Sequence, residues 1–231
     1  GDLPEKFPES ELSYRRQVKK HWVSAHPLKA GRRLAASDMI MKRVHDCPAD
    51  TADFDKLVGR VMERDCPAEY PLTRLDVSQT VWALVVARMR SSRLPGKALL
   101  DVAGMPALRH LLERLKQAKT VNKIVMCTTE EKEDDVLVDV AQQAGIGWYR
   151  GPVEDVLARM LGALEGQSVD IILRVTGDDI LVDPDYADRA VYHHLGYNVE
   201  YSDMKALPGG TEVEVFDVSL LRDIWRAAKD S

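Results

Sequence analysis

Short apolar runs alternate with segments of helical period from residue 79 onward. The runs VWALVVA, NKIVMC, IGWYR, DIILRV, NVEYS and TEVEVF are apolar or β-branched enough to form strands. Segments with helical period span 105–119, 133–144 and 153–164. In the first of these, Leu108, Leu111, Leu112 and Leu115 share one face. Regular alternation of strand and helix predicts an α/β fold with a mainly parallel sheet covered on both faces.

The region before residue 79 has a different composition and no regular hydrophobic pattern. Its short hydrophobic pieces are separated by Pro, Gly and charged residues, and only 53–62 has a pattern that permits a helix. This composition predicts a small module of short strands and turns. We therefore expect two domains, 1–76 and 77–231, joined by a short linker at 74–79.

Composition narrows the class of protein. The 231 residues are 45% hydrophobic and 30% charged, as in ordinary globular proteins, and the net charge of -5 argues against nucleic-acid binding. No apolar run approaches the roughly 20 residues of a membrane span, and no signal peptide is visible. Cys47, Cys66 and Cys127 form no CxxC pair, which suits a reducing compartment. We expect a cytoplasmic protein that binds neither nucleic acid nor membrane.

A cationic loop follows the first strand of the alternating region. The sequence LVVARMRSSRLPGK at 84–97 runs from a buried strand into a turn-rich segment. Its cations are Arg88, Arg90, Arg93 and Lys97. Such a loop at the carboxyl edge of a parallel sheet favours a triphosphate site, with backbone N–H groups around Ser91, Ser92 and Gly96 adding donors. Neither the P-loop pattern nor a GxGxxG fingerprint is present. The alternative is a solvated basic turn.

A carboxylate follows a second predicted strand at the same edge. The strand at 171–175 ends in Thr176-Gly177, and Asp178 comes next. A carboxylate there is suited to hold Mg²⁺ against a phosphate. Asp179 and Asp183 have simpler interpretations, as a turn residue and a helix cap. A purely structural role for Asp178 is the alternative to metal binding.

Three motifs together carry a family resemblance. RLPGK is followed by Asp101, Gly104 and Pro106, RVTGDDILVDP spans 174–184, and YRGPVEDVLAR spans 149–159. These segments resemble cytidylyltransferases that make CMP-activated sugar acids, including those of spore coat polysaccharide synthesis. The resemblance implies a Rossmann-like (GT-A-like) nucleotidyltransferase fold. It also implies that CTP and a sugar acid or sugar phosphate are the substrates and that Mg²⁺ is the cofactor.

The resemblance also assigns roles to individual residues. Arg93 and Lys97 would neutralise the β- and γ-phosphates, Asp178 would be the catalytic metal ligand, and Arg88 would contact phosphate or support the loop. The remaining assignments concern the nucleotide and the acceptor: Ser91, Ser92, Gly96, Thr128, Thr129, Arg150 and Asp155 for the nucleotide, and Glu212 and Glu214 for the acceptor. The resemblance makes Arg159 a further candidate for the nucleotide and sugar pocket. Asp155 and Arg159 are spaced i, i+4, however, which is also typical of an ordinary surface pair. Glu212 and Glu214 equally suit a solvated strand face.

The first module has its own resemblance, to the antifreeze-like (SAF) domain of sialic acid synthases. The residues that match are Arg15, Arg16, Leu28, Gly31, Leu34, Asp38, Lys42, Arg43, Leu57, Val58, Gly59, Arg60 and Asp65. The resemblance implies a β-clip fold, a homodimer, and a sugar contact from Arg43. An unrelated small β-rich domain is the alternative.

The sequence thus predicts a CTP- and Mg²⁺-dependent cytidylyltransferase of surface polysaccharide biosynthesis. One departure bears on this prediction. Relatives continue beyond this sequence and supply a further aspartate to the metal site, so we expect either a fragment or an incomplete site. The alternative function is a non-catalytic nucleotide-binding or assembly domain. A third possibility retains the chemistry and changes the base of the nucleotide.

Overall fold

The computed structural model describes residues 8–10, 14, 18–44, 51–90, 94–204 and 207–229. The chain divides into two compact units, one of residues 1–78 with 195–198 and one of residues 79–194 with 199–231. Each unit is described by itself below. Within the described residues, no helix is both long enough and apolar enough to cross a membrane.

The smaller unit is built on an antiparallel pair, β1 (Lys20–Ser24) and β2 (Met39–Arg43), and on isolated bridges. Its core gathers residues from loops as much as from strands: Leu28, Leu34, Met39, Ala52, Leu57, Met62, Cys66, Leu72 and Val77. The helix expected at 53–62 is only the short α2 (Phe54–Leu57). It ends there because Gly59 adopts a φ of 78° and Val61 then pairs with Arg33.

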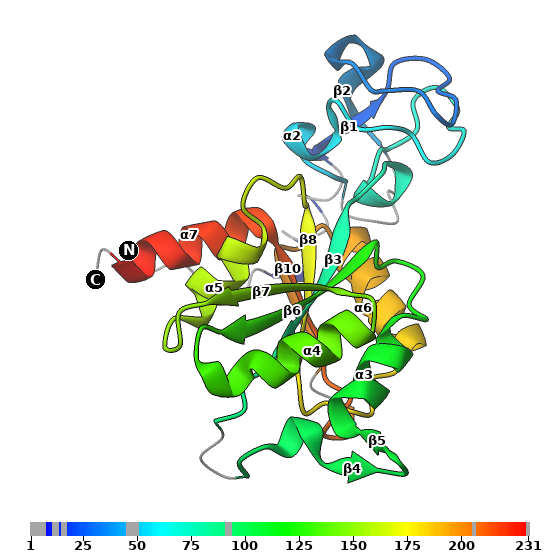
Figure 1. Ribbon diagram of the computed structural model, residues 1–231. Coiled ribbons are helices and arrows are strands. Elements are labelled where there is room, and N and C mark those ends of the chain that lie inside the picture. Colours follow the sequence, from blue (N-terminus) through cyan, green and yellow to red (C-terminus); the bar gives the residue numbers. More distant parts are fainter. Residues whose placement is uncertain are drawn as a thin grey trace. The chain divides into compact units, whose positions relative to one another are not determined.

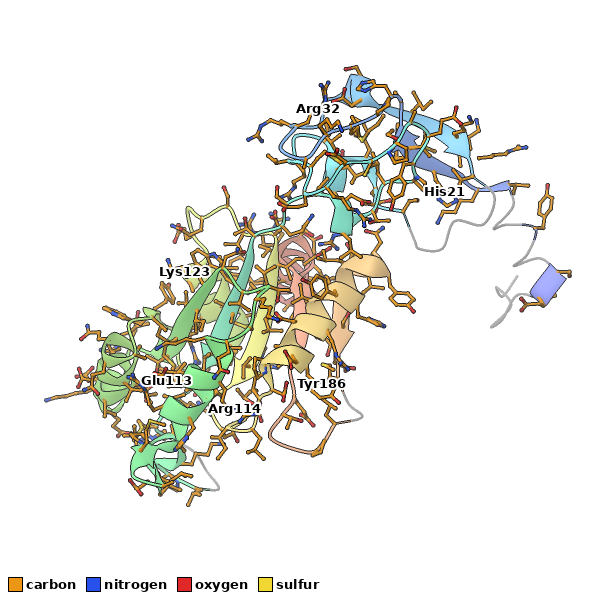
Figure 2. All side chains as sticks on the ribbon, turned by 90° about the vertical axis from the view of Figure 1, so that its right-hand side faces the viewer. His21, Arg32, Glu113, Arg114, Lys123 and Tyr186 are labelled. Carbon is orange, nitrogen blue, oxygen red and sulfur yellow. The ribbon has the colours of Figure 1, made fainter. Side chains whose placement is uncertain are left out.

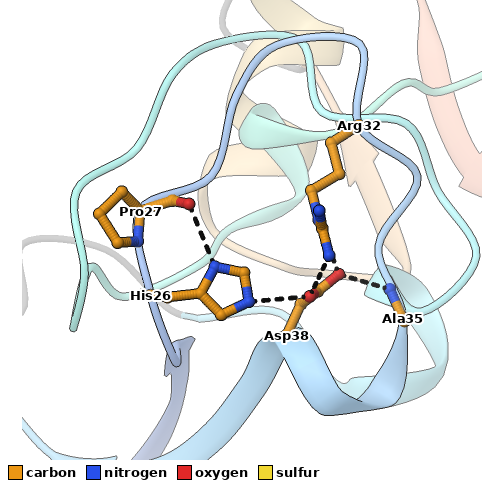
Figure 3. A network of polar contacts seen from close by, with 5 residues as sticks. All are labelled: His26, Pro27, Arg32, Ala35 and Asp38. Atoms are coloured by element: carbon orange, nitrogen blue, oxygen red, sulfur yellow. Dashed lines mark hydrogen bonds and ion pairs between the residues drawn. The ribbon is translucent and has the colours of Figure 1, made fainter.

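A buried carboxylate organises one loop of this unit (Figure 3). Asp38 is 1% exposed, and it accepts bonds from the Arg32 guanidinium at 2.6 and 3.0 Å. The Ala35 backbone N–H donates to it at 2.9 Å, and a ring nitrogen of His26 lies 3.0 Å away. These partners, Arg32 first, lower the pKa of the Asp38 carboxyl to about 2 despite its burial.

The larger unit contains a six-stranded sheet with the order β7-β6-β3-β8-β10-β9 (Figure 1). Its strands are β3 (Val81–Val86), β6 (Lys123–Thr129), β7 (Gly147–Gly151), β8 (Ile171–Thr176), β9 (Tyr201–Asp203) and β10 (Glu214–Asp217). The first four are parallel, and β10 runs antiparallel to both β8 and β9. The prediction of a mainly parallel sheet is confirmed.

Helices cover both faces of this sheet (Figure 1). They are α3 (Ala107–Leu115), α4 (Asp135–Gln143), α5 (Val156–Ala163), α6 (Pro184–Gly196) and α7 (Val218–Lys229). Alternate strand residues such as Trp82 and Leu84 pack with Met160 of α5 and Leu221 of α7 in one cluster. The leucine face predicted for α3 is fully buried. The helix starts later than predicted because the hairpin of β4 (Asp101–Val102) and β5 (Met105–Pro106) precedes it.

The parallel strands place their carboxyl ends along one edge, where the loops after β3 and β8 meet. Short 3-10 segments, η3 (Lys97–Leu99) and η4 (Lys132–Asp134), follow β3 and β6 at this edge. Arg114 of α3 donates through Nε to the carbonyl of Val182 at 2.7 Å, which fixes the segment after β8 against α3. Figure 2 labels Arg114, and also Lys123, which begins β6 and therefore lies at the other end of the strands.

Candidate active site

A cleft of about 320 Å³ opens at the carboxyl ends of β3 and β8. Strand ends, the cationic loop and the loop before α5 all contribute to its walls. The lining residues are Val86, Ala87, Arg88, Arg90, Lys97, Ala98, Val153, Glu154, Val156, Arg159, Thr176, Gly177 and Asp178. The cleft therefore brings together three of the motifs that the sequence placed far apart along the chain.

Lys97 and Asp178 meet across this cleft. The Lys97 ammonium donates to Oδ2 of Asp178, and their side chains are 29% and 43% exposed. Gly96, with a φ of 71°, turns the loop so that η3 begins at Lys97, and its N–H donates to the Met89 carbonyl at 3.1 Å. A cation at this rim is suited to bind the phosphates of a nucleoside triphosphate, and a carboxylate beside it is suited to bind the metal ion that accompanies them.

Gly177 allows the ends of β3 and β8 to approach each other closely. Its N–H donates to the Val86 carbonyl at 2.9 Å. A Cβ atom at position 177 would stand 2.6 Å from the Cβ of Ala87, which is closer than carbon atoms pack. A glycine is thus required there for steric reasons, and it brings Asp178 to the rim next to the first strand.

Asp134 anchors the start of the cationic loop, a role that the sequence analysis did not predict. Its buried carboxylate accepts the backbone N–H of Met89 at 2.7 Å and that of Thr129 at 3.1 Å, together with the Thr129 hydroxyl. The chain leaving β3 is thereby tied to the end of β6. Because the Thr129 donors are buried and the Met89 N–H is partly buried, the carboxylate replaces the hydrogen bonds that water would otherwise supply.

The structure describes only part of the cationic loop. Arg88 and Arg90 line the cleft, and Nη1 of Arg88 lies 3.9 Å from Glu154, which is a weak ion pair at most. Ser91, Ser92 and Arg93 lie outside the described residues. Their assignments to phosphate binding stay predictions.

Thr128, Thr129 and Arg150 serve the scaffold around the cleft, and none of them lines it. The two threonines are fully buried at the end of β6. The Arg150 guanidinium donates to the carbonyls of Thr129 and Glu131 at 2.8 and 2.7 Å and pairs with Asp135 at 2.5 Å. The nucleotide contacts that the resemblance implies for these three residues stay predictions.

Asp155 and Arg159 do not form the surface pair that their spacing allows. Asp155 caps α5 by accepting the Ala158 N–H at 2.8 Å, and its second oxygen accepts the Trp225 indole N–H at 3.3 Å. Arg159 is 1% exposed, and its guanidinium turns back to the carbonyls of Pro152 and Val153. Asp155 is therefore a helix cap, whereas Arg159 is one of the residues that line the cleft.

A second, smaller pocket of about 160 Å³ lies beside the first, and Thr176 lines both. Its walls include Arg174, Asp179, Asp203, Glu212 and Glu214. Burial, and secondarily the neighbouring carboxylates, raise the pKa of Asp179, although the Thr176 hydroxyl donates to it. The Arg174 guanidinium pairs with Glu214.

Glu212 precedes β10 and is exposed, whereas Glu214 is the first residue of that strand. Arg43 ends β2 of the smaller unit and is exposed. The predicted substrate contacts of Glu212, Glu214 and Arg43 stay predictions. Glu212 and Glu214 do line the smaller pocket together.

The arrangement is suited to phosphate chemistry and offers no protein nucleophile within the described residues of the cleft. Cys127 is fully buried, and burial raises the pKa of its thiol to about 12. No group of three or more His, Cys, Asp or Glu side chains in the described ranges is placed to hold a metal alone. Cations and the carboxylates of Glu154 and Asp178 therefore define the site.

The family model described as Cytidylyltransferase matches residues 82–231. The chain belongs to the cytidylyltransferase family. The match starts at β3 and includes the cleft, the smaller pocket and the entire sheet.

Several curated proteins are similar in sequence to this cytidylyltransferase chain. The spore coat polysaccharide biosynthesis protein SpsF of Bacillus subtilis is 33% identical over 147 residues, covering 62% of this chain and 61% of its own length. The uncharacterized protein MJ1063 of Methanocaldococcus jannaschii is 36% identical, covering 64% and 60%. A 3-deoxy-manno-octulosonate cytidylyltransferase of Trichlorobacter lovleyi is 32% identical over 49% of the chain. The matched regions span about three fifths or less of these relatives.

Solved structures support the same fold. A cytidylyltransferase from Leptospira borgpetersenii superposes with a TM-score of 0.59 and 34% identity, covering 63% of both chains. CMP:2-keto-3-deoxy-manno-octonic acid synthetase complexed with CTP gives a TM-score of 0.52 at 17% identity, covering 64% of this chain and 78% of that one. The second likeness is one of fold.

Proposed function

We propose that this chain provides the nucleotide site of an enzyme that transfers CMP from CTP to a sugar acid or sugar phosphate, releasing pyrophosphate. The observation that carries the proposal is the meeting of Lys97 and Asp178 at one rim of the cleft, at the carboxyl edge of the sheet. The names of SpsF and of the octulosonate cytidylyltransferases point to polysaccharide precursors as the product class. In this proposal the smaller pocket, with Glu212 and Glu214, receives the acceptor.

Positioning and charge neutralisation account for the chemistry. Lys97 and the arginines at 88 and 90 would offset the charge on the β- and γ-phosphates, so that pyrophosphate leaves more readily. The shared wall at Thr176 would hold the acceptor hydroxyl close to the α-phosphorus. No covalent enzyme intermediate is needed.

Mg²⁺ fits the residues present. This ion is commonly held by one or two carboxylates together with substrate phosphates and water. Asp178 offers one accessible carboxylate, and Asp179 lies beside it with its carboxylate engaged by Thr176. When bound, the ion would neutralise charge that develops on the phosphate oxygens.

The finer features predicted from sequence remain part of the proposal. Residues 1–76 would be an SAF-like module, which is consistent with the small β1–β2 unit and its loop-rich core. The protein would act in the cytoplasm, where CTP is available, and as a homodimer.

Pyrophosphate release tests the proposal directly. The chain is incubated with Mg²⁺, one of the four nucleoside triphosphates and a panel of 3-deoxy-octulosonic and nonulosonic acids. Pyrophosphate formed only with CTP, and only when an acceptor is present, is the expected result. Binding of CTP without turnover with any acceptor would favour a non-catalytic nucleotide-binding domain. Equal turnover with purine triphosphates would contradict the cytidine assignment.

A further inference from the structure

Arg159 is a buried cation that has no carboxylate partner among the described residues. It is 1% exposed, and it has the largest side chain among those that are fully buried. Nε donates to the carbonyl of Pro152 at 3.0 Å, and Nη2 donates to that of Val153 at 2.8 Å. No hydrogen bond from Nη1 is found within the part of the chain that the structure describes.

This arrangement is costly for the folded protein when nothing is bound. A guanidinium removed from water is stabilised chiefly by an opposite charge, and two neutral carbonyls compensate only partly. Burial lowers the pKa of Arg159, and the positive charge of Arg88 lowers it further, while Asp134 and Glu154 act in the opposite direction. Arg88 thus adds to the cost, and Asp134 and Glu154 offset part of it.

The position of Arg159 indicates what could offset this cost. Its side chain lines the same cleft as Arg88, Arg90 and Lys97. An anion in that cleft would be attracted by a charge that is shielded from bulk water and so weakly screened. The two carbonyl bonds also hold the 152–154 segment at Pro152 and Val153, and Val153 and Glu154 form part of the cleft wall.

We infer that Arg159 is a positioning residue for the nucleotide, whose buried charge draws the phosphates into the cleft while its two carbonyl bonds fix the 152–154 wall. This inference rests on the proposed function, because it takes a nucleoside triphosphate as the ligand. The resemblance made Arg159 a candidate for the nucleotide and sugar pocket, and its burial and its lack of a carboxylate partner among the described residues give it a specific role there. The charge and wall contributions can be separated experimentally.

A ligand series separates charge from structure. Dissociation constants for cytidine, CMP, CDP and CTP are measured by calorimetry for the wild type, Arg159→Gln and Arg159→Lys. If the charge acts on the phosphates, Arg159→Gln weakens CTP binding about 10- to 100-fold, weakens CMP less, and leaves cytidine unchanged. Arg159→Lys retains most of the CTP affinity. Arg226→Gln, an exposed charge change in the same unit, is the matched control and has no effect.

The outcomes distinguish the two claims. Equal loss for all four ligands, or equal loss for the Gln and Lys variants, means that Arg159 only supports the wall and overturns the inference. Wild-type protein that fails to bind CTP instead overturns the proposed function. A second measurement needs no variant: the Arg159 Nε NMR signal of the wild type should shift on addition of tripolyphosphate and not of cytidine. An Nε signal that tripolyphosphate leaves unmoved would also overturn the inference.

Discussion

Lys97 and Asp178 form an ion pair across the mouth of the cleft, 81 positions apart in the sequence. Each side chain partly neutralises the other before any nucleotide binds. A triphosphate would attract Lys97, and a divalent cation would attract Asp178, so the nucleotide–metal complex replaces one ion pair with two. Removing Lys97 should therefore affect nucleotide binding, and removing Asp178 should affect activity.

Replacing Lys97 by alanine should weaken nucleotide binding. Losing a charge-assisted contact to a phosphate corresponds to about 10- to 100-fold in the dissociation constant of CTP. Calorimetric titration with CTP and Mg²⁺ measures this directly. The control is Lys123→Ala. It removes a lysine at the amino end of β6, away from the cleft, and should leave CTP affinity unchanged. Equal effects of the two substitutions would mean that general charge, and not the position of Lys97, governs binding.

Replacing Asp178 by asparagine should spare binding and remove activity. The neutral amide releases Lys97 to the phosphates but is a poor ligand for Mg²⁺, so the rate should fall about 100-fold or more. Single-turnover pyrophosphate release, combined with a CTP titration, separates the two effects. Full turnover by Asp178→Asn would rule out the metal assignment.

Replacing Asp134 by alanine should destabilise the larger unit and increase the disorder of the cationic loop that follows β3. The substitution leaves two backbone N–H groups and one hydroxyl without their acceptor, at a cost of about 3 kcal/mol. Urea unfolding, followed by hydrogen exchange of peptides from β3 and β6, measures the change. Asp139→Ala, at an exposed position of α4, is the matched control and should change stability by less than about 0.5 kcal/mol.

The sequence predicted the sheet and the meeting of Lys97 with Asp178 for one physical reason. Parallel strands bring their carboxyl ends to a common edge, so residues that follow two such strands converge whatever their separation in the chain. The strand order and the antiparallel β10 were not predicted, because they depend on packing between elements far apart in sequence.

Individual roles within the site were harder to predict. Five of the six residues at 130–135 are acidic, and nothing in the sequence distinguishes the buried Asp134 from its exposed neighbours. Arg159 has the spacing of a surface partner for Asp155, yet Asp155 caps the helix and leaves the arginine to the interior. Such choices are decided by tertiary contacts, which local spacing does not encode.

Replacing Gly177 by alanine should move the Asp178 rim and destabilise the sheet edge. The added methyl would lie 2.6 Å from the Cβ of Ala87, and overpacking of this kind costs about 1 to 3 kcal/mol. Because the next contacts, the Cα of Ala87 and the carbonyl of Val86, are at 3.5 Å, a second substitution, Ala87→Gly, should relieve the clash. We expect the double variant to recover most of the stability that Gly177→Ala loses in urea unfolding. Additive losses in the double variant would contradict this explanation.

Acid should destabilise the smaller unit through Asp38. Arg32, Ala35 and His26 hold the pKa of this carboxyl at about 2, below its usual value near 4 (Figure 3). Since the folded pKa is the lower one, the folded state binds fewer protons, and the stabilisation is complete above about pH 4 and is lost as the pH falls towards 2.

The NMR signal of the Trp22 indole, which packs on the core of this unit, reports its unfolding in the full chain. Asp38→Asn should make the unit less stable at pH 7 and remove its contribution to the acid transition, whereas Asp55→Asn, at an exposed position, should leave the transition unchanged. An acid transition of the same size in Asp38→Asn would show that other carboxyl groups control the stability of this unit.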